Sequence, residues 1–174
     1  MTRHGSHKHR RNTINRRSIL TLIPMAIAWL WIALVSSSAV AQSAADMEGV
    51  EAASKAFYAA LAVIDDSEAM EKVWAHTPYV TLVGPRSKSI MIGWEGQKEY
   101  WAAANKRTSQ RNVSLSGQQI HVNGNLAWEM GQERGTVILK DGKEINIDII
   151  VTNVYEKING HWLMVSHHVQ PKPK

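Results

Sequence analysis

Three dipeptides constrain most strongly how this chain can fold: Asn123-Gly124, Asp141-Gly142 and Asn159-Gly160. Each one is a strong hairpin signal, because asparagine or aspartate followed by glycine tolerates the positive φ angles of a tight turn. β-rich runs of alternating character lie between them. Three hairpins in series therefore predict a four-stranded antiparallel meander. The expected strands are 112–122, 126–139, 144–158 and 161–169.

The segment before the first hairpin has a helical period instead. Five apolar residues recur at steps of three and four, which is typical of an amphipathic helix. They are Val50, Ala53, Phe57, Leu61 and Ile64. The run Asp65-Asp66-Ser67 offers capping side chains for a second, short helix. Glu68 and Glu71 would then stand in its first turn, where the helix dipole favours them.

Two short strands and a third helix are expected between these helices and the hairpins. Tyr79–Val83 has the composition of a strand that ends at Gly84-Pro85, and Ser89–Gly93 that of a second one. Trp94 begins a helix that extends to about Lys106. Helices followed by a sheet of long, curling strands predict an α+β class, with the helices on the concave side of the sheet.

The formal net charge of +5 is distributed unevenly along the chain. Residues 1–41 hold six of the 20 Lys and Arg residues and no Asp or Glu, which leaves 14 basic residues against 15 acidic ones in the remainder. A nearly neutral domain offers no basic stripe for phosphates. Nucleic acid is therefore not an expected partner.

The basic leader has the layout of an export signal. It runs into the apolar stretch Ile19–Val35 and ends at Ala39-Val40-Ala41, a small-residue cleavage site. The pair Arg16-Arg17 resembles the twin-arginine export motif of bacteria, and ordinary secretion is the alternative route. The mature protein is then expected to be periplasmic or secreted, and to meet a membrane only through the signal during export.

This layout divides the chain into three parts. Residues 1–41 are the predicted cleavable signal, residues 42–170 the folded domain, and residues 171–174 a loose tail. An uncleaved membrane anchor is the alternative for the first part, because its apolar stretch is nearly long enough to span a bilayer. The chain has no cysteine, so its domain must be held together by a buried core rather than by disulfides.

The closing hairpin carries a family resemblance. The segment Thr152-Asn153-Val154-Tyr155 … Asn159-Gly160-His161-Trp162 … His167-His168 resembles the Thr-x-Val … Gly-x-Trp … His ending of SnoaL-like domains in the nuclear transport factor 2-like superfamily. The resemblance implies a cone-shaped (cystatin-like) α+β fold, in which N-terminal helices pack on a curled, mainly antiparallel sheet around a pocket. It implies less about chemistry, because this fold hosts enzymes, ligand binders and assembly domains.

A two-residue turn at Asn159-Gly160 sets the register of the last two strands. If Ile158 pairs with His161, alternate residues of both strands share one face, and similar counting across Asp141-Gly142 extends that face to the preceding strand. We interpret it as the pocket wall, because it gathers aromatic side chains dotted with polar groups. With residues from the helices, the predicted ligand-binding set is Tyr58, Trp94, Trp101, Trp128, Met130, Gln132, Asn153, Tyr155, Ser166 and His168.

The adjacent residues His167 and His168 point to opposite faces in that register, so they cannot bind one metal ion together. No metal site is predicted, since the chain also lacks cysteines and a two-His-plus-carboxylate spacing. His168 is the candidate functional histidine, and a histidine that is merely hydrogen-bonded in the core is its plainer alternative. His167 is expected on the outer face. Trp74 and Trp162 are expected to fill the core.

The first helix bears on whether the protein is an enzyme. The run Phe57-Tyr58-Ala59-Ala60-Leu61 … Asp66 resembles the same segment of ketosteroid isomerases in this superfamily, and Tyr58 matches their oxyanion-binding tyrosine. Their general base is an aspartate before a proline. The matching position here is Gly84, in Val83-Gly84-Pro85. Because glycine cannot accept a proton, isomerase chemistry of that type is not expected.

The sequence therefore predicts an exported SnoaL-like domain that binds a small, largely apolar molecule, with no cofactor and no identified catalysis. One alternative is a cofactor-independent lyase, isomerase or hydrolase with His168 as acid–base. Another is a dimerisation module with a vestigial pocket. A homodimer is expected because Ile150, Val154, Leu163 and Val165 form an apolar patch on the outer face, and members of the superfamily often pair sheet to sheet.

Overall fold

A computed structural model describes residues 1, 23–64, 66 and 68–172, with the side chains of the first helix described from Ser43 onward. The basic leader up to residue 22 and residues 65, 67 and 173–174 lie outside the described residues. The chain divides into two compact units, Met1–Ala41 and Gln42–Lys174. In the part of the chain that the structure describes, no helix combines the length and the hydropathy needed to cross a membrane.

Three helices precede the long strands: α1 (Ile23–Ala62), α2 (Glu68–Glu71) and α3 (Trp94–Arg107). The predicted apolar stripe of α1 faces the core, where Phe57 is fully buried and Leu61 nearly so. The predicted cap of α2 is also confirmed, because Asp66 Oδ1 accepts the backbone N–H of Glu68 at 2.8 Å.

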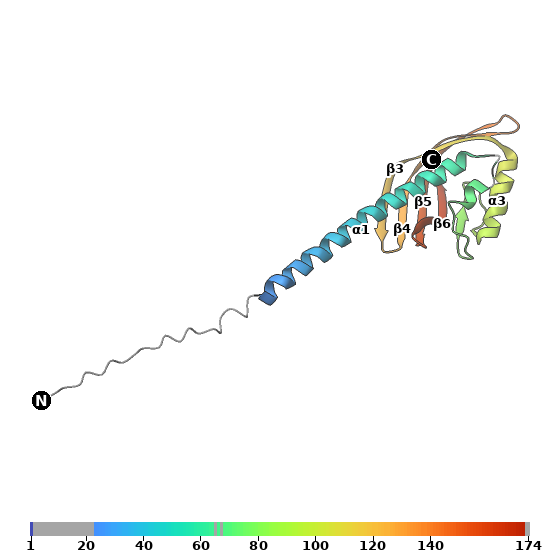
Figure 1. The fold of residues 1–174 in the computed structure, drawn as a ribbon. Helices are drawn as coiled ribbons and strands as arrows, with labels where there is room; N and C mark the ends of the chain where they lie inside the picture. Colours follow the sequence, from blue (N-terminus) through green and yellow to red (C-terminus); the bar gives the residue numbers. More distant parts are fainter. Residues whose placement is uncertain (2–22, 65, 67, 173–174) are drawn as a thin grey trace. The chain divides into compact units, whose positions relative to one another are not determined.

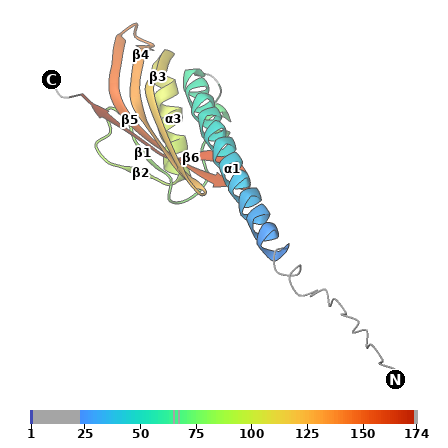
Figure 2. The same ribbon diagram turned by 90° about the vertical axis from the view of Figure 1, so that its left-hand side faces the viewer.

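Six strands form one sheet in the order β2-β1-β6-β5-β4-β3. Their bounds are β1 Thr81–Val83, β2 Met91–Ile92, β3 Thr108–Asn123, β4 Leu126–Leu139, β5 Glu144–Ile158 and β6 His161–Pro171. Only the pair β1 and β6 is parallel among the described strands. The long strands bend around α3 and the C-terminal part of α1 (Figures 1 and 2). The α+β class with helices on the concave face is confirmed.

All three predicted hairpins form, and the last one has the predicted turn. Asn159 and Gly160 adopt φ angles of 51° and 83°, so both central residues of the turn are left-handed, as in a type I′ hairpin. Ile158 pairs with His161, as predicted from the two-residue turn. The turn chemistry therefore positions the beginning of β6 correctly against β5.

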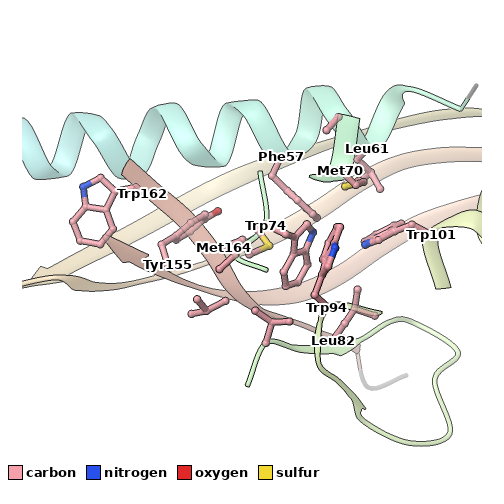
Figure 3. Packing of buried hydrophobic residues seen from close by; sticks show 14 of the residues in the cluster. Phe57, Leu61, Met70, Trp74, Leu82, Trp94, Trp101, Tyr155, Trp162 and Met164 are labelled. Carbon is pink, nitrogen blue, oxygen red and sulfur yellow. The ribbon is translucent and has the colours of Figure 1, made fainter. Parts of the chain in front are cut away.

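The core lies between the helices and the concave face of the sheet (Figure 3). Phe57 of α1 packs edge-on against Trp74 and Trp101, with ring centroids 6.2 and 6.4 Å apart. Trp162 lies against α1 at Gly49, where an added Cβ would stand 2.6 Å from the indole ring. Trp74 and Trp162 are buried in this core, which confirms their predicted role.

The end of the chain is held more firmly than expected. β6 continues through Pro171, which pairs with Ile149 of β5. The next residue, Lys172, forms an ion pair with Asp148. The first two residues of the expected loose tail thus contact strand β5, while residues 173–174 lie outside the described residues.

Candidate functional site

A row of polar side chains crosses the concave face of the sheet. Glu129 of β4 pairs with Asn153 of β5, which pairs with His167 of β6. Glu133 shares their face, because alternate residues of a strand point to the same side. All four are buried. With two tyrosines that bond to them, they form what we call the polar cluster: Tyr58, Glu129, Glu133, Asn153, Tyr155 and His167.

Glu129 organises one half of the polar cluster. Its Oε2 accepts hydrogen bonds from Asn153 Nδ2 at 2.7 Å and from the Tyr155 hydroxyl at 2.9 Å. Its Oε1 accepts one from Gln118 Nε2. A fully buried carboxyl group needs such donors, since burial removes its water. Glu129 therefore fixes the orientation of the Asn153 amide.

Asn153 in turn determines which nitrogen of His167 carries the proton. Its amide nitrogen donates to Glu129, so its Oδ1 faces His167 Nδ1, 2.8 Å away. The hydrogen-bond network thus assigns the proton to Nδ1 and leaves Nε2 as an acceptor. Burial lowers the pKa of His167 to about 3, so its ring is neutral at neutral pH. Nε2 lies 4.0 Å from Glu133 Oε1.

Glu133 is the member of the polar cluster that titrates near neutral pH. Burial raises its pKa to about 7, and the hydrogen bond that it accepts from the Tyr58 hydroxyl at 2.9 Å opposes that rise only in part. Burial also raises the pKa of Tyr58, which keeps the phenol protonated as a donor. Glu133 can therefore hold or release a proton near pH 7, beside the acceptor nitrogen of His167.

A cavity of about 440 Å³ adjoins Glu133 and His167. Its walls come from α3, the four long strands and the loop between β1 and β2. Much of its lining is apolar, and Trp101 contributes an aromatic wall near Phe57 (Figure 3). A concave, mainly apolar space with a few polar groups is the usual form of a small-molecule site.

The loop between β1 and β2 begins at Gly84, which lies close to the side chain of Tyr100. An added Cβ would stand 2.4 Å from the hydroxyl oxygen of Tyr100, which also lines the cavity. The resemblance to ketosteroid isomerases places an aspartate at this position, and such a side chain would displace Tyr100. The carboxyl group that lines this cavity is instead Glu133 of β4.

The predicted pocket positions of Trp128, Met130 and Gln132 are wrong. These residues lie on the outer face of β4, where Trp128 and Met130 are exposed. The reason is the β4–β5 loop, in which the Leu139 N–H donates to the Lys143 carbonyl at 2.9 Å and encloses three residues instead of two. One additional loop residue moves every side chain of the strand to the other face.

The predicted orientations of Ser166, His167 and His168 are also wrong. β6 keeps the predicted register up to Met164, and a β-bulge at Val165 then shifts it by one residue. His167 consequently points into the polar cluster, whereas His168 is exposed and Ser166 lies on the outer side. The histidine next to the cavity is therefore His167.

The remaining predicted ligand-binding residues lie on the concave side. Tyr58, Asn153 and Tyr155 belong to the polar cluster, and Trp101 lines the cavity. Trp94 is part of the hydrophobic core. Among the described residues, no three His, Asp or Glu side chains come close enough together to hold a metal ion.

Sequence reasoning missed the two glutamates of β4 and the buried Arg111 of β3. Glu129 and Glu133 alternate along β4 with the small residues Ala127 and Gly131. That pattern was a usable signal, because small residues on a strand leave space for a helix or a neighbouring side chain. With the three-residue length of the β4–β5 loop, the counting of residues would have placed Glu129 and Glu133 on the concave face.

The cone of helices and curled sheet is found in solved structures of nuclear transport factor 2-like proteins. A proposed dehydratase of that family from Streptomyces avermitilis is 22% identical, with a TM-score of 0.68 over 76% of this chain and 99% of that one. A superfamily protein from Salmonella enterica is 24% identical, with a TM-score of 0.61 over 79% and 94%. The association domain of the C. elegans kinase CaMKII is 15% identical, with a TM-score of 0.57 over 74% and 98%. These similarities establish the fold.

The family follows from the sequence itself. Residues 50–170 match the SnoaL-like domain, so the chain belongs to the SnoaL-like domain family. The match covers α1 from Val50 onward and nearly all of the sheet. No curated protein matches the chain.

Proposed function

We propose that this domain binds a small, largely apolar molecule in the cavity beside the polar cluster. The observation that carries the proposal is the cavity of about 440 Å³, whose lining is largely apolar and includes polar groups such as Glu133, His167 and Arg111. A site of this size and composition encloses most of a small ligand, and its few polar groups orient that ligand.

The proposal can be tested with N-phenyl-1-naphthylamine, a neutral probe that becomes fluorescent in apolar surroundings. We expect saturable binding by the wild-type protein. Val113→Trp would fill the cavity that Val113 lines, and it should weaken the affinity for the probe about tenfold or more.

Ser114→Trp is the matched control, because Ser114 is the next residue of β3 and its exposed side chain points to the opposite face. Its affinity for the probe should equal that of the wild type, and circular dichroism should show that both variants are folded. Failure of the wild-type protein to bind the probe, or equal losses in the two variants, would contradict the proposal.

A second candidate function is acid–base catalysis without a cofactor. The specific observation is that Glu133, with a pKa of about 7, faces the unprotonated Nε2 of His167 at the edge of the cavity. In this candidate function the acid–base histidine is His167 rather than His168, which the sequence had suggested. In an enzyme, Glu133→Gln should abolish turnover while the fluorescent probe still binds. Persistence of turnover in that variant would count against the enzyme.

The outer face of the sheet supports the proposal of a homodimer. Leu126, Trp128 and Met130 of β4 are exposed there, Val154 of β5 pairs with Trp128, and Leu163 of β6 lies on the same face. We call these five residues the outer patch. Val165, which was predicted on this face, is instead buried in the core. Exposed apolar side chains gathered on one face of a sheet favour an interaction surface. The C. elegans CaMKII domain, which has a similar fold, is named an association domain.

We expect Trp128→Lys to convert a dimer into a monomer, because it would place an unpaired charge inside the interface. Ile92→Lys is the control, since Ile92 is an exposed apolar residue on the edge strand β2, outside the outer patch. Light scattering at micromolar concentration measures both masses. A monomeric wild type, or a Trp128→Lys dimer, would contradict this interface.

The two proposals can be separated by the same measurements. If the probe binds and the protein does not dimerise, only the cavity proposal stands. If the protein dimerises and the probe does not bind, a dimerisation module is favoured.

Export remains a proposal supported by the sequence of the leader. The basic residues before the apolar stretch, together with Ala39-Val40-Ala41, favour a cleaved signal and a periplasmic or secreted mature protein. N-terminal sequencing of the exported protein should find a start at or near Gln42. An intact leader on that protein would contradict cleavage.

A further inference from the structure

Arg111 is a buried cation without an acidic partner among the described residues. Its side chain belongs to β3 and only 8% of the residue is exposed, yet none of the ion pairs in the described part of the chain includes it. Its Nη1 donates to the Leu61 carbonyl at 3.2 Å, whereas Nη2 has no hydrogen-bond partner among the described residues. Buried charges are normally paired, because desolvation without a counter-charge is costly.

The surroundings of Arg111 are positively charged. Arg86, Lys88 and Arg107 line the same cavity. Burial raises the pKa of Tyr100, the positive charges of Arg111, Arg86 and Arg107 oppose that rise, and the charge of Glu133 adds to it. An anion that entered the cavity would therefore find several cations and one hydroxyl donor.

Arg111 and Glu133 stand far apart along the sheet. Arg111 pairs with Val137, and Leu115 pairs with Glu133. Four residue steps of β3 separate these two rows, which corresponds to about 13 Å along the strand. This spacing explains why the two side chains form no ion pair. Between the two rows the cavity is lined by apolar side chains such as Val113.

We propose that the ligand of this cavity is an amphipathic monocarboxylate whose carboxylate binds Arg111 and whose other end lies against Glu133 and His167. This inference rests on the proposed binding function and names the chemical class of the ligand. A guanidinium group matches the geometry of a carboxylate, with two parallel hydrogen bonds. A single buried cation balances a single negative charge, and the carboxyl group of Glu133 disfavours a second anionic group at the far end.

If Arg111 served only to stabilise the fold, a different binding preference would be expected. The guanidinium group bonds to the end of α1 and lies over the Trp101 ring, with 5.9 Å between Cζ and the ring centroid. If these contacts were its whole purpose, the cavity would not distinguish a carboxylate from a neutral molecule of the same shape. A pair of such molecules therefore separates the two roles.

The test compares 2-naphthoate with 2-naphthamide, which has the same ring system and no charge, by calorimetric titration of the full-length protein. We expect the wild-type protein to bind 2-naphthoate about tenfold or more tightly than 2-naphthamide. Arg111→Gln should remove this preference and leave the affinity for 2-naphthamide nearly unchanged. Arg86→Gln is the control, because Arg86 is exposed at the cavity and its loss should reduce the preference far less.

The outcomes separate this inference from the function on which it rests. Equal binding of the two compounds by the wild type would overturn the inference and leave the binding function intact. Failure of both compounds together with N-phenyl-1-naphthylamine would overturn both. If Arg111→Gln does not fold, Arg111→Lys keeps the cation without the planar fork, and it should show an intermediate preference.

Discussion

Replacing Glu129 with leucine should lower the free energy of unfolding by about 4 kcal/mol, because each buried donor that it leaves unpaired costs about 1–3 kcal/mol. Two such donors are the Asn153 amide and the Tyr155 hydroxyl, which bond to Glu129 at 2.7 and 2.9 Å. Neither can turn to water, since both residues are fully buried. Leucine has nearly the size of glutamate but accepts no hydrogen bond.

Urea unfolding of the two proteins at one pH measures this difference. Glu156→Leu is the matched control, because Glu156 is also a strand glutamate that accepts a tyrosine hydroxyl, from Tyr79 at 2.6 Å, but it is only partly buried and Tyr79 is exposed. Its effect should stay below about 1 kcal/mol, since water can replace the lost acceptor. A loss below 1 kcal/mol for Glu129→Leu would mean that the polar cluster does not depend on this carboxyl group.

The hairpins were predictable because their turns are encoded locally. Asn159-Gly160 adopts the positive φ angles that this dipeptide tolerates, and β4 and β5 have the predicted bounds. The α1 stripe was predictable for a similar reason, since its period alone identifies the face that meets the core. These features gave the α+β class without knowledge of any contact between distant residues.

The site was harder to predict because the side of a strand depends on counting single residues. The third residue in the loop after Leu139 and the bulge at Val165 each shift a register by one. Each shift exchanges the inner and outer faces of the strand beyond it. Neither is encoded in a local dipeptide, because Asp141-Gly142 is compatible with loops of two or three residues and a bulge is set by packing across the sheet.

These two shifts together decide which titratable groups meet. The loop brings Glu129 and Glu133 to the concave face, and the bulge brings His167 there in place of His168. Tyr58, Asn153 and Tyr155 lie on the concave side, as predicted, because no shift separates them from the elements that the sequence defines well, although none of the three lines the cavity. The sequence thus identified half of the polar cluster and replaced its acid–base groups with their neighbours.

Glu133 should make the stability of the fold depend on pH. Burial raises its pKa from 4.5 to about 7, so the folded protein retains a proton that the unfolded chain has already released. Stability from this group is therefore fully present below about pH 4.5 and is lost as the pH rises toward 7 and above. Glutamine at this position keeps the shape of the protonated carboxyl group and cannot ionise.

Glu133→Gln should consequently gain stability relative to the wild type as the pH increases. Between pH 5 and pH 8 the difference between the two free energies of unfolding should grow by roughly 2–3 kcal/mol, since each unit of pKa shift corresponds to about 1.4 kcal/mol. Urea unfolding of both proteins at the two pH values gives this number, and subtraction removes the contributions of all other groups, including His167. Glu144→Gln, at an exposed strand position, should show no such change.

A constant difference between Glu133→Gln and the wild type would mean that Glu133 ionises in the folded protein as it does in the unfolded chain. The carboxyl group would then be unsuited to proton transfer near neutral pH, because it would already be ionised there.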